Sequence, residues 1–125
     1  MTQEDKELLL KDLCARLPYG VKVKTKGDDE SYTLLAIHPY KDIAVIGLQF
    51  DSVFAVSEIK IDCVLPHLRL MSSMTEYEEY SFRKWQANFE NNTYDWLNAH
   101  HFDYRGLIEK GLAIALTEEN NPYKE

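Results

Sequence analysis

The sequence predicts an α+β fold in which an N-terminal helix precedes a small curved antiparallel sheet, with C-terminal helices packed on that sheet. Apolar residues recur at helical spacing over 1–17, alternate with polar residues over 21–65, and return to helical spacing over 75–113. Strands gathered in one half of a chain and helices in the other are typical of this class. Residues 1–125 have the size of a single domain, and we expect its polar end at 118–125 to be frayed.

The first segment carries the signals of a helix start, an apolar face and a helix stop. Thr2 is a suitable N-cap, and Glu4 and Asp5 place negative charge in the first turn, where the helix dipole favours it. The apolar face consists of Leu9, Leu10, Leu13, Cys14 and Leu17. Pro18 and Gly20 follow at once and end the helix.

Short segments with strand patterning come next. Val21, Val23 and Thr25 alternate with lysines, which is the period of a half-buried strand. Exposed lysines favour an edge strand, with an anion-binding ridge as the less favoured interpretation. Residues 32–38 and 43–48 form further strands, the second being the most apolar and therefore central, and one more extended stretch follows. The pattern leaves open whether this sheet closes into an SH3-like barrel.

Helical patterning resumes in the second half of the chain. Thr75 with Glu78 three residues later forms a capping box, which predicts a helix start. Phe82, Trp85 and Phe89 recur at helical spacing, so we expect this aromatic stripe to face the core. A second, shorter helix follows the adjacent asparagines and ends near the adjacent histidines.

The composition is that of a globular chain with an acidic balance. The net charge is −7 and no basic stripe is present, so direct binding to nucleic acid is not expected. No segment approaches the roughly 20 apolar residues of a membrane span, and the N-terminus lacks the blocks of a secretory signal, so we expect a cytoplasmic protein. Cys14 and Cys63 lie far apart without the spacing of a zinc site, and we expect no metal or other cofactor.

The densest polar cluster lies just past the end of the second predicted helix. The candidate binding residues there are Trp96, His100, His101, Asp103, Tyr104 and Arg105. Two histidines and a carboxylate could supply three ligands to a metal. Adjacent histidines point about 100° apart on a helix, however, so the favoured interpretation is a histidine that caps the helix C-terminus beside a local Asp–Arg pair. No catalytic residue and no metal ligand is assigned here.

Three stretches carry a resemblance: LPYGV at 17–21, LRLMSSMT at 68–75 and DWLNAHHFDYRGLIEKGLA at 95–113. Together they cover 32 of the 125 residues, and the sequence resembles a family of small uncharacterised proteins from phage-like and mobile elements of gut anaerobes. The resemblance brings no activity, cofactor or catalytic residue with it. Leu70 stands where that pattern has proline. What the resemblance implies is an accessory protein of phage-like origin.

Three functional hypotheses remain, and the chain is more consistent with a non-enzymatic protein. The first is an accessory or interaction protein that binds another protein or a copy of itself, because interfaces are rich in aromatic residues. The rings expected on that surface are Tyr94, Trp96, Phe102 and Tyr104.

The alternative is a small metal-dependent or acid/base enzyme that uses His100, His101 and Asp103. A third hypothesis is a regulator of phage or host DNA metabolism that presents an acidic face to a DNA-binding protein. The acids of that face are Glu76, Glu79 and Glu90.

Overall fold

The protein has an N-terminal helix, a six-stranded mixed sheet and C-terminal helices, which confirms the predicted α+β class. The computed structural model describes residues 2–28, 30–50, 53–117 and 119–123. Across these residues, no helix combines the length and the apolar character that crossing a bilayer requires.

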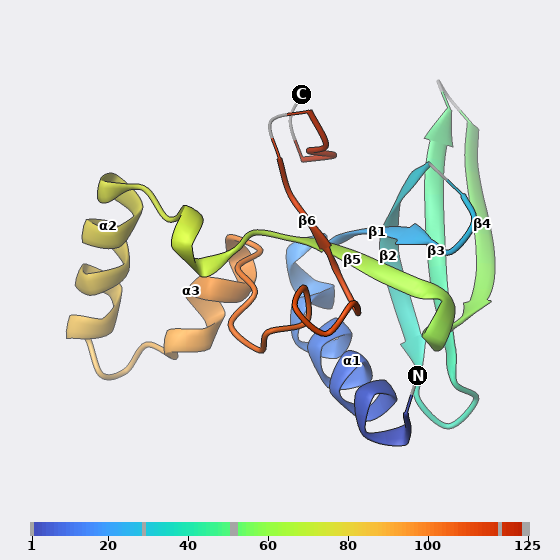
Figure 1. Cartoon of the computed structure of the whole chain (residues 1–125), viewed down its shortest axis with the longest axis horizontal. Coiled ribbons are helices and arrows are strands. Elements are labelled where there is room, and N and C mark those ends of the chain that lie inside the picture. The colour runs from blue at the N-terminus through green and yellow to red at the C-terminus, as the bar shows by residue number, and fades with distance from the viewer. Residues whose placement is uncertain (1, 29, 51–52, 118, 124–125) are drawn as a thin grey trace.

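Helix α1 (Gln3–Arg16) forms as its sequence signals predict. The side chain of Thr2 accepts a backbone hydrogen bond of 3.1 Å in the first turn, which satisfies one of the amides left without a partner at a helix start. Leu9 and Leu13 are fully buried, and Figure 1 shows α1 lying against the sheet. A short 3-10 turn follows the helix and ends at Gly20, whose φ of 68° is a left-handed conformation that glycine adopts without strain.

The sheet is open and almost entirely antiparallel. Its strands are β1 (Lys22–Thr25), β2 (Ser31–His38), β3 (Ile43–Phe50), β4 (Val53–Lys60), β5 (Val64–Leu68) and β6 (Ile114–Ala115). Their order in space is β4-β3-β2-β1-β5-β6, and only the contact between β5 and β6 is parallel. Because β4 and β6 form two separate edges, the sheet does not close into the barrel that the sequence left open.

Strand β1 lies inside the sheet, so the interpretation of its lysines as protection for an edge strand is wrong. Residue Val23 pairs with Tyr32 on β2 and with Pro66 on β5, which brings neighbours to both sides of β1. The lysines instead occupy the face opposite the buried valines, and the ammonium group of Lys22 donates to the hydroxyl of Thr33 at 2.6 Å. Local alternation predicts which face a residue takes and carries no information about a partner strand 40 residues away.

Two clusters of buried apolar residues fill the interior. The larger one lies between α1 and the sheet, with Leu9, Leu13, Val23, Ile46, Val64 and Leu68 among its members. The smaller one contains Trp96, Leu97 and Phe102, with Phe82 and Trp85 packed at its margin. Helix α3 (Thr93–Ala99) supplies two of these residues, Trp96 and Leu97, whereas α1 supplies Leu9 and Leu13 to the larger cluster.

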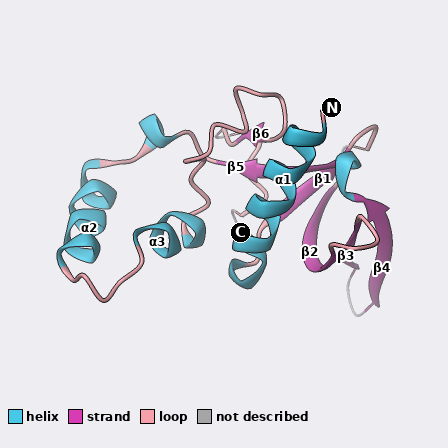
Figure 2. Ribbon diagram, turned by 90° about the horizontal axis from the view of Figure 1, so that it is seen from below, coloured by secondary structure: helices cyan, strands magenta, loops and turns pink. Residues whose placement is uncertain are grey.

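Helix α2 (Glu76–Ala87) projects to the end of the molecule opposite β4, as Figures 1 and 2 show. Its capping box is formed: Thr75 accepts from the amide of Glu78, and the Glu78 carboxylate accepts from the amide of Thr75. None of the helix residues is buried.

The aromatic stripe predicted to face the core does so only in part. Phe82 and Trp85 are half-buried beside Trp96, with the Phe82 and Trp96 ring centroids 5.0 Å apart. Phe89 lies beyond the helix end and is 97% exposed, so its assignment to the core is wrong. Helical spacing in the sequence extends past the point at which the helix stops, and for this reason the period alone misplaces the ring.

The described part of the tail is docked on the sheet, where the sequence predicted a frayed end. The hydroxyl of Tyr123 donates to the carbonyl of His67 at 2.9 Å and accepts from the amide of Lys22 at 2.8 Å. Its ring stacks on His101 with centroids 3.9 Å apart. Burial raises the pKa of this phenol. A single aromatic ring thus bridges β1 and β5. Residues 118, 124 and 125 of the predicted tail lie outside the described residues.

The anchor of α2 gives a first prediction. Arg69 binds the Glu78 carboxylate through two hydrogen bonds of 2.5 and 2.7 Å, and the first cause of the fall in the pKa of Glu78 to about 2 is this contact. We expect Glu78→Gln, which retains the capping box but not the charge, to lower the free energy of unfolding by about 1 kcal/mol. Urea denaturation measures the change. Glu79→Gln breaks an exposed ion pair with Arg83 and serves as the matched control, with an expected change below about 0.5 kcal/mol.

Candidate functional site

The predicted site residues lie together around the end of α3, where each has its own partner. Trp96 is buried, and its ring stacks on His100 with centroids 3.9 Å apart. The Nδ1 atom of His100 is 2.8 Å from the Trp96 carbonyl oxygen. An imidazole in this position caps a carbonyl in the last turn of the helix, where a donor is favoured.

His101 turns the chain away from His100. Its φ of 63° is in the left-handed region, and its ring packs on Tyr123. Burial is the first cause that lowers the pKa of His101 to about 4, followed by the positive charge of Arg16 and the neighbouring His100. The imidazole is therefore neutral at physiological pH.

Asp103 completes a structural turn. Its two carboxylate oxygens accept the backbone amides of Leu107 at 2.9 Å and Ile108 at 3.0 Å. Its own amide donates to the carbonyl of Arg69 at 2.8 Å. His100, His101 and Asp103 thus serve three separate contacts, and no group of three His, Cys, Asp or Glu side chains among the described residues could hold a metal ion.

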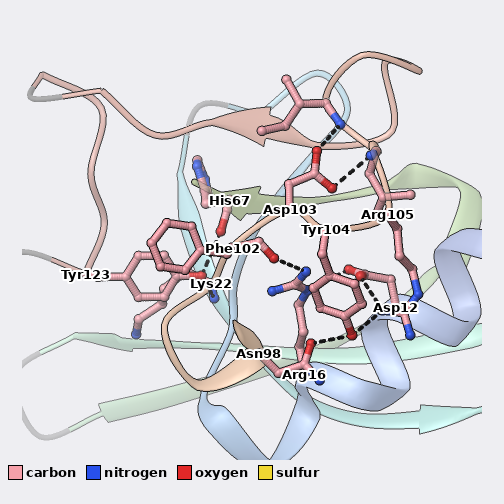
Figure 3. Close-up of polar contacts among 12 residues, drawn as sticks. Asp12, Arg16, Lys22, His67, Asn98, Phe102, Asp103, Tyr104, Arg105 and Tyr123 are labelled. Atoms are coloured by element: carbon pink, nitrogen blue, oxygen red, sulfur yellow. Dashed lines mark hydrogen bonds and ion pairs between the residues drawn. The ribbon is translucent and has the colours of Figure 1, made fainter. Parts of the chain in front are cut away.

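Tyr104 and Arg105 belong to a different arrangement, centred on a buried ion pair that the sequence analysis missed (Figure 3). Asp12 and Arg16 lie on α1 and are fully buried. The Asp12 carboxylate accepts from Nε of Arg16 at 2.8 Å and from Nη1 of Arg105 at 2.9 Å. The signal in the sequence was the i,i+4 spacing of Asp12 and Arg16 on the side of the helix that carries Leu9 and Leu13.

Further hydrogen bonds connect this pair to the loop after α3. Nη2 of Arg16 donates to the carbonyl of Phe102 at 2.5 Å. The hydroxyl of Tyr104 accepts from Nη1 of Arg105 at 2.7 Å and donates to Oδ1 of Asn98 at 2.9 Å. Two guanidinium groups therefore share one carboxylate, which leaves the network with an excess of positive charge.

An open recess of about 490 Å³ lies beside this network. Lys11 and Arg105 supply two cations to its lining, and Tyr94 and Tyr104 supply two phenol rings. The ring centroids of Tyr94 and Tyr104 are 4.9 Å apart, and the Arg105 guanidinium lies 4.6 Å from the Tyr104 centroid. This combination suits an anion that also carries a flat ring.

A second surface lies on α2, on the side turned away from the small cluster. We define the outer face of α2 as Glu76, Tyr77, Tyr80, Arg83 and Lys84. Tyr77 is 79% exposed and Tyr80 is 56% exposed. The Lys84 ammonium lies 5.0 Å from the Tyr80 centroid, so charged and aromatic groups already contact each other on this face.

No family model, curated protein or solved structure matches this chain. The phage-related resemblance therefore stays an expectation, and function has to be inferred from the chemistry of the residues themselves.

The buried ion pair gives a second prediction. Asp12→Asn keeps the volume of the side chain but leaves two guanidinium groups without their counter-charge, one of them fully buried. We expect the free energy of unfolding to fall by about 3 kcal/mol, because an unpaired buried charge is strongly destabilising. Urea denaturation tests this. Asp42→Asn, which removes the half-exposed pair with Lys6, is the control, with an expected change below about 1 kcal/mol; equal effects would contradict the central role of Asp12.

The histidine at position 101 gives a third prediction, for the pH dependence of stability. Between pH 6.5 and about 4 the unfolded chain binds a proton at His101 that the folded chain does not. The contribution of His101 to the free energy of unfolding is therefore fully present above pH 6.5. It declines as the pH falls towards 4, by on the order of 2 kcal/mol. His101→Asn, which tolerates the left-handed backbone, should flatten this decline in denaturation curves at several pH values. His38→Asn, at an exposed position, should retain the decline.

Proposed function

We propose that the protein is a non-enzymatic interaction module that associates with a second copy of itself through the outer face of α2. The observation that carries the proposal is the exposure of Tyr77 and Tyr80 on a helix with no buried residue. Surfaces that bind proteins are enriched in aromatic residues, and grouped exposed rings mark such surfaces. We propose further that it is a cytoplasmic accessory protein of phage-like origin.

The contact surface that supports this function consists of other residues than those expected from the sequence. Trp96 and Phe102 are buried in the small cluster, so they do not reach a partner. Tyr94 remains exposed, and the half-buried Tyr104 is held in the network of Arg105. Two other exposed rings, Tyr77 and Tyr80, lie close together on α2, whose remaining aromatic residues attach it to the body of the protein.

A second copy is the partner that the charges of α2 favour. Glu76 and Lys84 stand four residues before and four residues after Tyr80. In an antiparallel pair of helices centred on Tyr80, Glu76 of one copy therefore faces Lys84 of the other, and the reverse pair forms by symmetry. Four residues are about one helical turn, so all three side chains lie along one stripe.

The neighbouring positions show the same symmetry. Tyr77 and Arg83 stand three residues to either side of Tyr80, which brings a phenol ring of one copy near a guanidinium of the other. The antiparallel arrangement also places the acidic first turn of each helix beside the basic last turn of its partner. A helix of 12 residues is about 18 Å long, so the contact is small and the expected dissociation constant is in the micromolar range or weaker.

The other hypotheses receive less support. The enzyme hypothesis needs His100, His101 and Asp103 at one reaction centre, and each has a separate structural contact. The acidic-face hypothesis needs unneutralised acids at Glu76, Glu79 and Glu90, whereas Glu79 is paired with Arg83.

The fourth prediction tests the association by exchanging charges. Sedimentation equilibrium of the purified chain, from about 10 µM to about 1 mM, should show a monomer–dimer equilibrium. Glu76→Lys and Lys84→Glu should each weaken the dimer about tenfold, because each replaces two ion pairs by two repulsions. The double variant restores opposite charges and should recover the dimer.

Lys41→Glu, at an exposed turn position away from α2, is the matched control and should leave the equilibrium unchanged. A chain that stays monomeric throughout the range, or a double variant no tighter than either single variant, would contradict the proposal.

A further inference from the structure

The recess beside the buried network carries a second, independent inference. We propose that it binds a small aromatic phosphate of the nucleoside monophosphate class, with the phosphate on Lys11 and Arg105 and the ring on Tyr94. A volume of about 490 Å³ lies within the usual range of small-molecule sites. The residues come from α1, α3 and the loop after α3, so the fold brings both cations and both rings together.

The network around Asp12 carries an excess of positive charge. The Asp12 carboxylate pairs with both Arg16 and Arg105, and Lys11 adds another positive charge at the margin of the recess. The carboxylate of nearby Asp103 is bonded to backbone amides and points away from Tyr104 in Figure 3. Positive charge thus accumulates here in a chain whose net charge is −7. Such a local excess attracts an anion, most strongly at low ionic strength.

Arg105 has hydrogen-bonding capacity for a ligand. Within the described residues, both of its bonds leave from Nη1, to Asp12 and to the hydroxyl of Tyr104. The donors on Nη2 and Nε therefore remain for a ligand, and a guanidinium fork suits two oxygens of one phosphate. Asp12 and Tyr104 fix the guanidinium in place, so a ligand does not have to order it. Asp12 is in this sense a positioning residue.

The aromatic lining of the recess sets the class of ligand. Tyr94 is packed on Tyr104 through one side and is still 56% exposed. A phenol ring beside two cations provides a stacking surface next to a phosphate position, and stacking accepts any nucleobase because every base has a flat face. Inorganic phosphate uses the cations alone, and a nucleoside uses the ring alone. Only a ligand with both groups uses the whole recess.

The test compares three probes on the full chain by isothermal titration calorimetry at low salt: adenosine monophosphate, adenosine and inorganic phosphate. We expect the monophosphate to bind at least about tenfold tighter than either fragment. Lys11→Glu should abolish its binding, and Tyr94→Ala should weaken it about fivefold while leaving the affinity for phosphate unchanged. Tyr94→Phe keeps the ring and should bind as the wild type does. Lys11 and Tyr94 are exposed, so these variants should fold, and circular dichroism checks that they do.

Lys41→Glu changes the net charge by the same amount outside the recess and should leave binding intact. Equal affinity for the monophosphate and phosphate would overturn the role of Tyr94, and the absence of binding, or equal losses in Lys11→Glu and Lys41→Glu, would overturn the site. The proposal does not depend on dimer formation, since a monomeric Lys84→Glu variant should retain ligand binding.

Discussion

The buried ion pair of Asp12 and Arg16 is the constraint on which the arrangement of the two halves of the chain depends. Both side chains are fully buried on α1, beside the leucines that pack on the sheet. Removing charges from water costs several kcal/mol per ion unless partners replace the water. Those partners are the Phe102 carbonyl and Arg105, which come from the other end of the chain. The loop after α3 must therefore close over α1, and it carries α2 and α3 with it.

This closure explains the division of the molecule into a packed body and a projecting helix. Once the loop is fixed, the Arg69 guanidinium lies over Phe102, 4.3 Å from the ring centroid. The same guanidinium donates to the Glu78 carboxylate at the start of α2. Only one side of α2, the side that carries Phe82 and Trp85, then packs against Trp96. None of the residues that the structure describes covers the opposite side, so its exposed tyrosines follow from the position of the anchor and not from a loosely folded helix.

The features predicted from the sequence were those with local causes. The caps at Thr2 and Thr75, the alternation in β1 and the leucine face of α1 depend on residues within a few positions of one another, and each was confirmed. Cys14, which was expected on that face, is exposed instead. The interior place of β1, the docking of Tyr123 and the contact between Asp12 and Arg105 join residues 39 to 101 positions apart. Periodicity carries no record of such pairings. The same limit explains why Trp96 and Phe102 were expected on a surface, because an aromatic residue suits a core and an interface equally well.

The recess and the outer face of α2 share a structural connection through α3, since Tyr94 and Trp96 belong to one helix. A shared helix is not sufficient for communication, which requires an element with two arrangements of similar free energy. Here α3 is held on one side by the Tyr104–Asn98 hydrogen bond and on the other by the contact of Trp96 with Phe82. Shifting it would break the hydrogen bond of the buried Asn98 and separate Trp96 from the small apolar cluster, at a cost of a few kcal/mol. A weak ligand supplies less than that, so the two surfaces should act independently on a rigid frame.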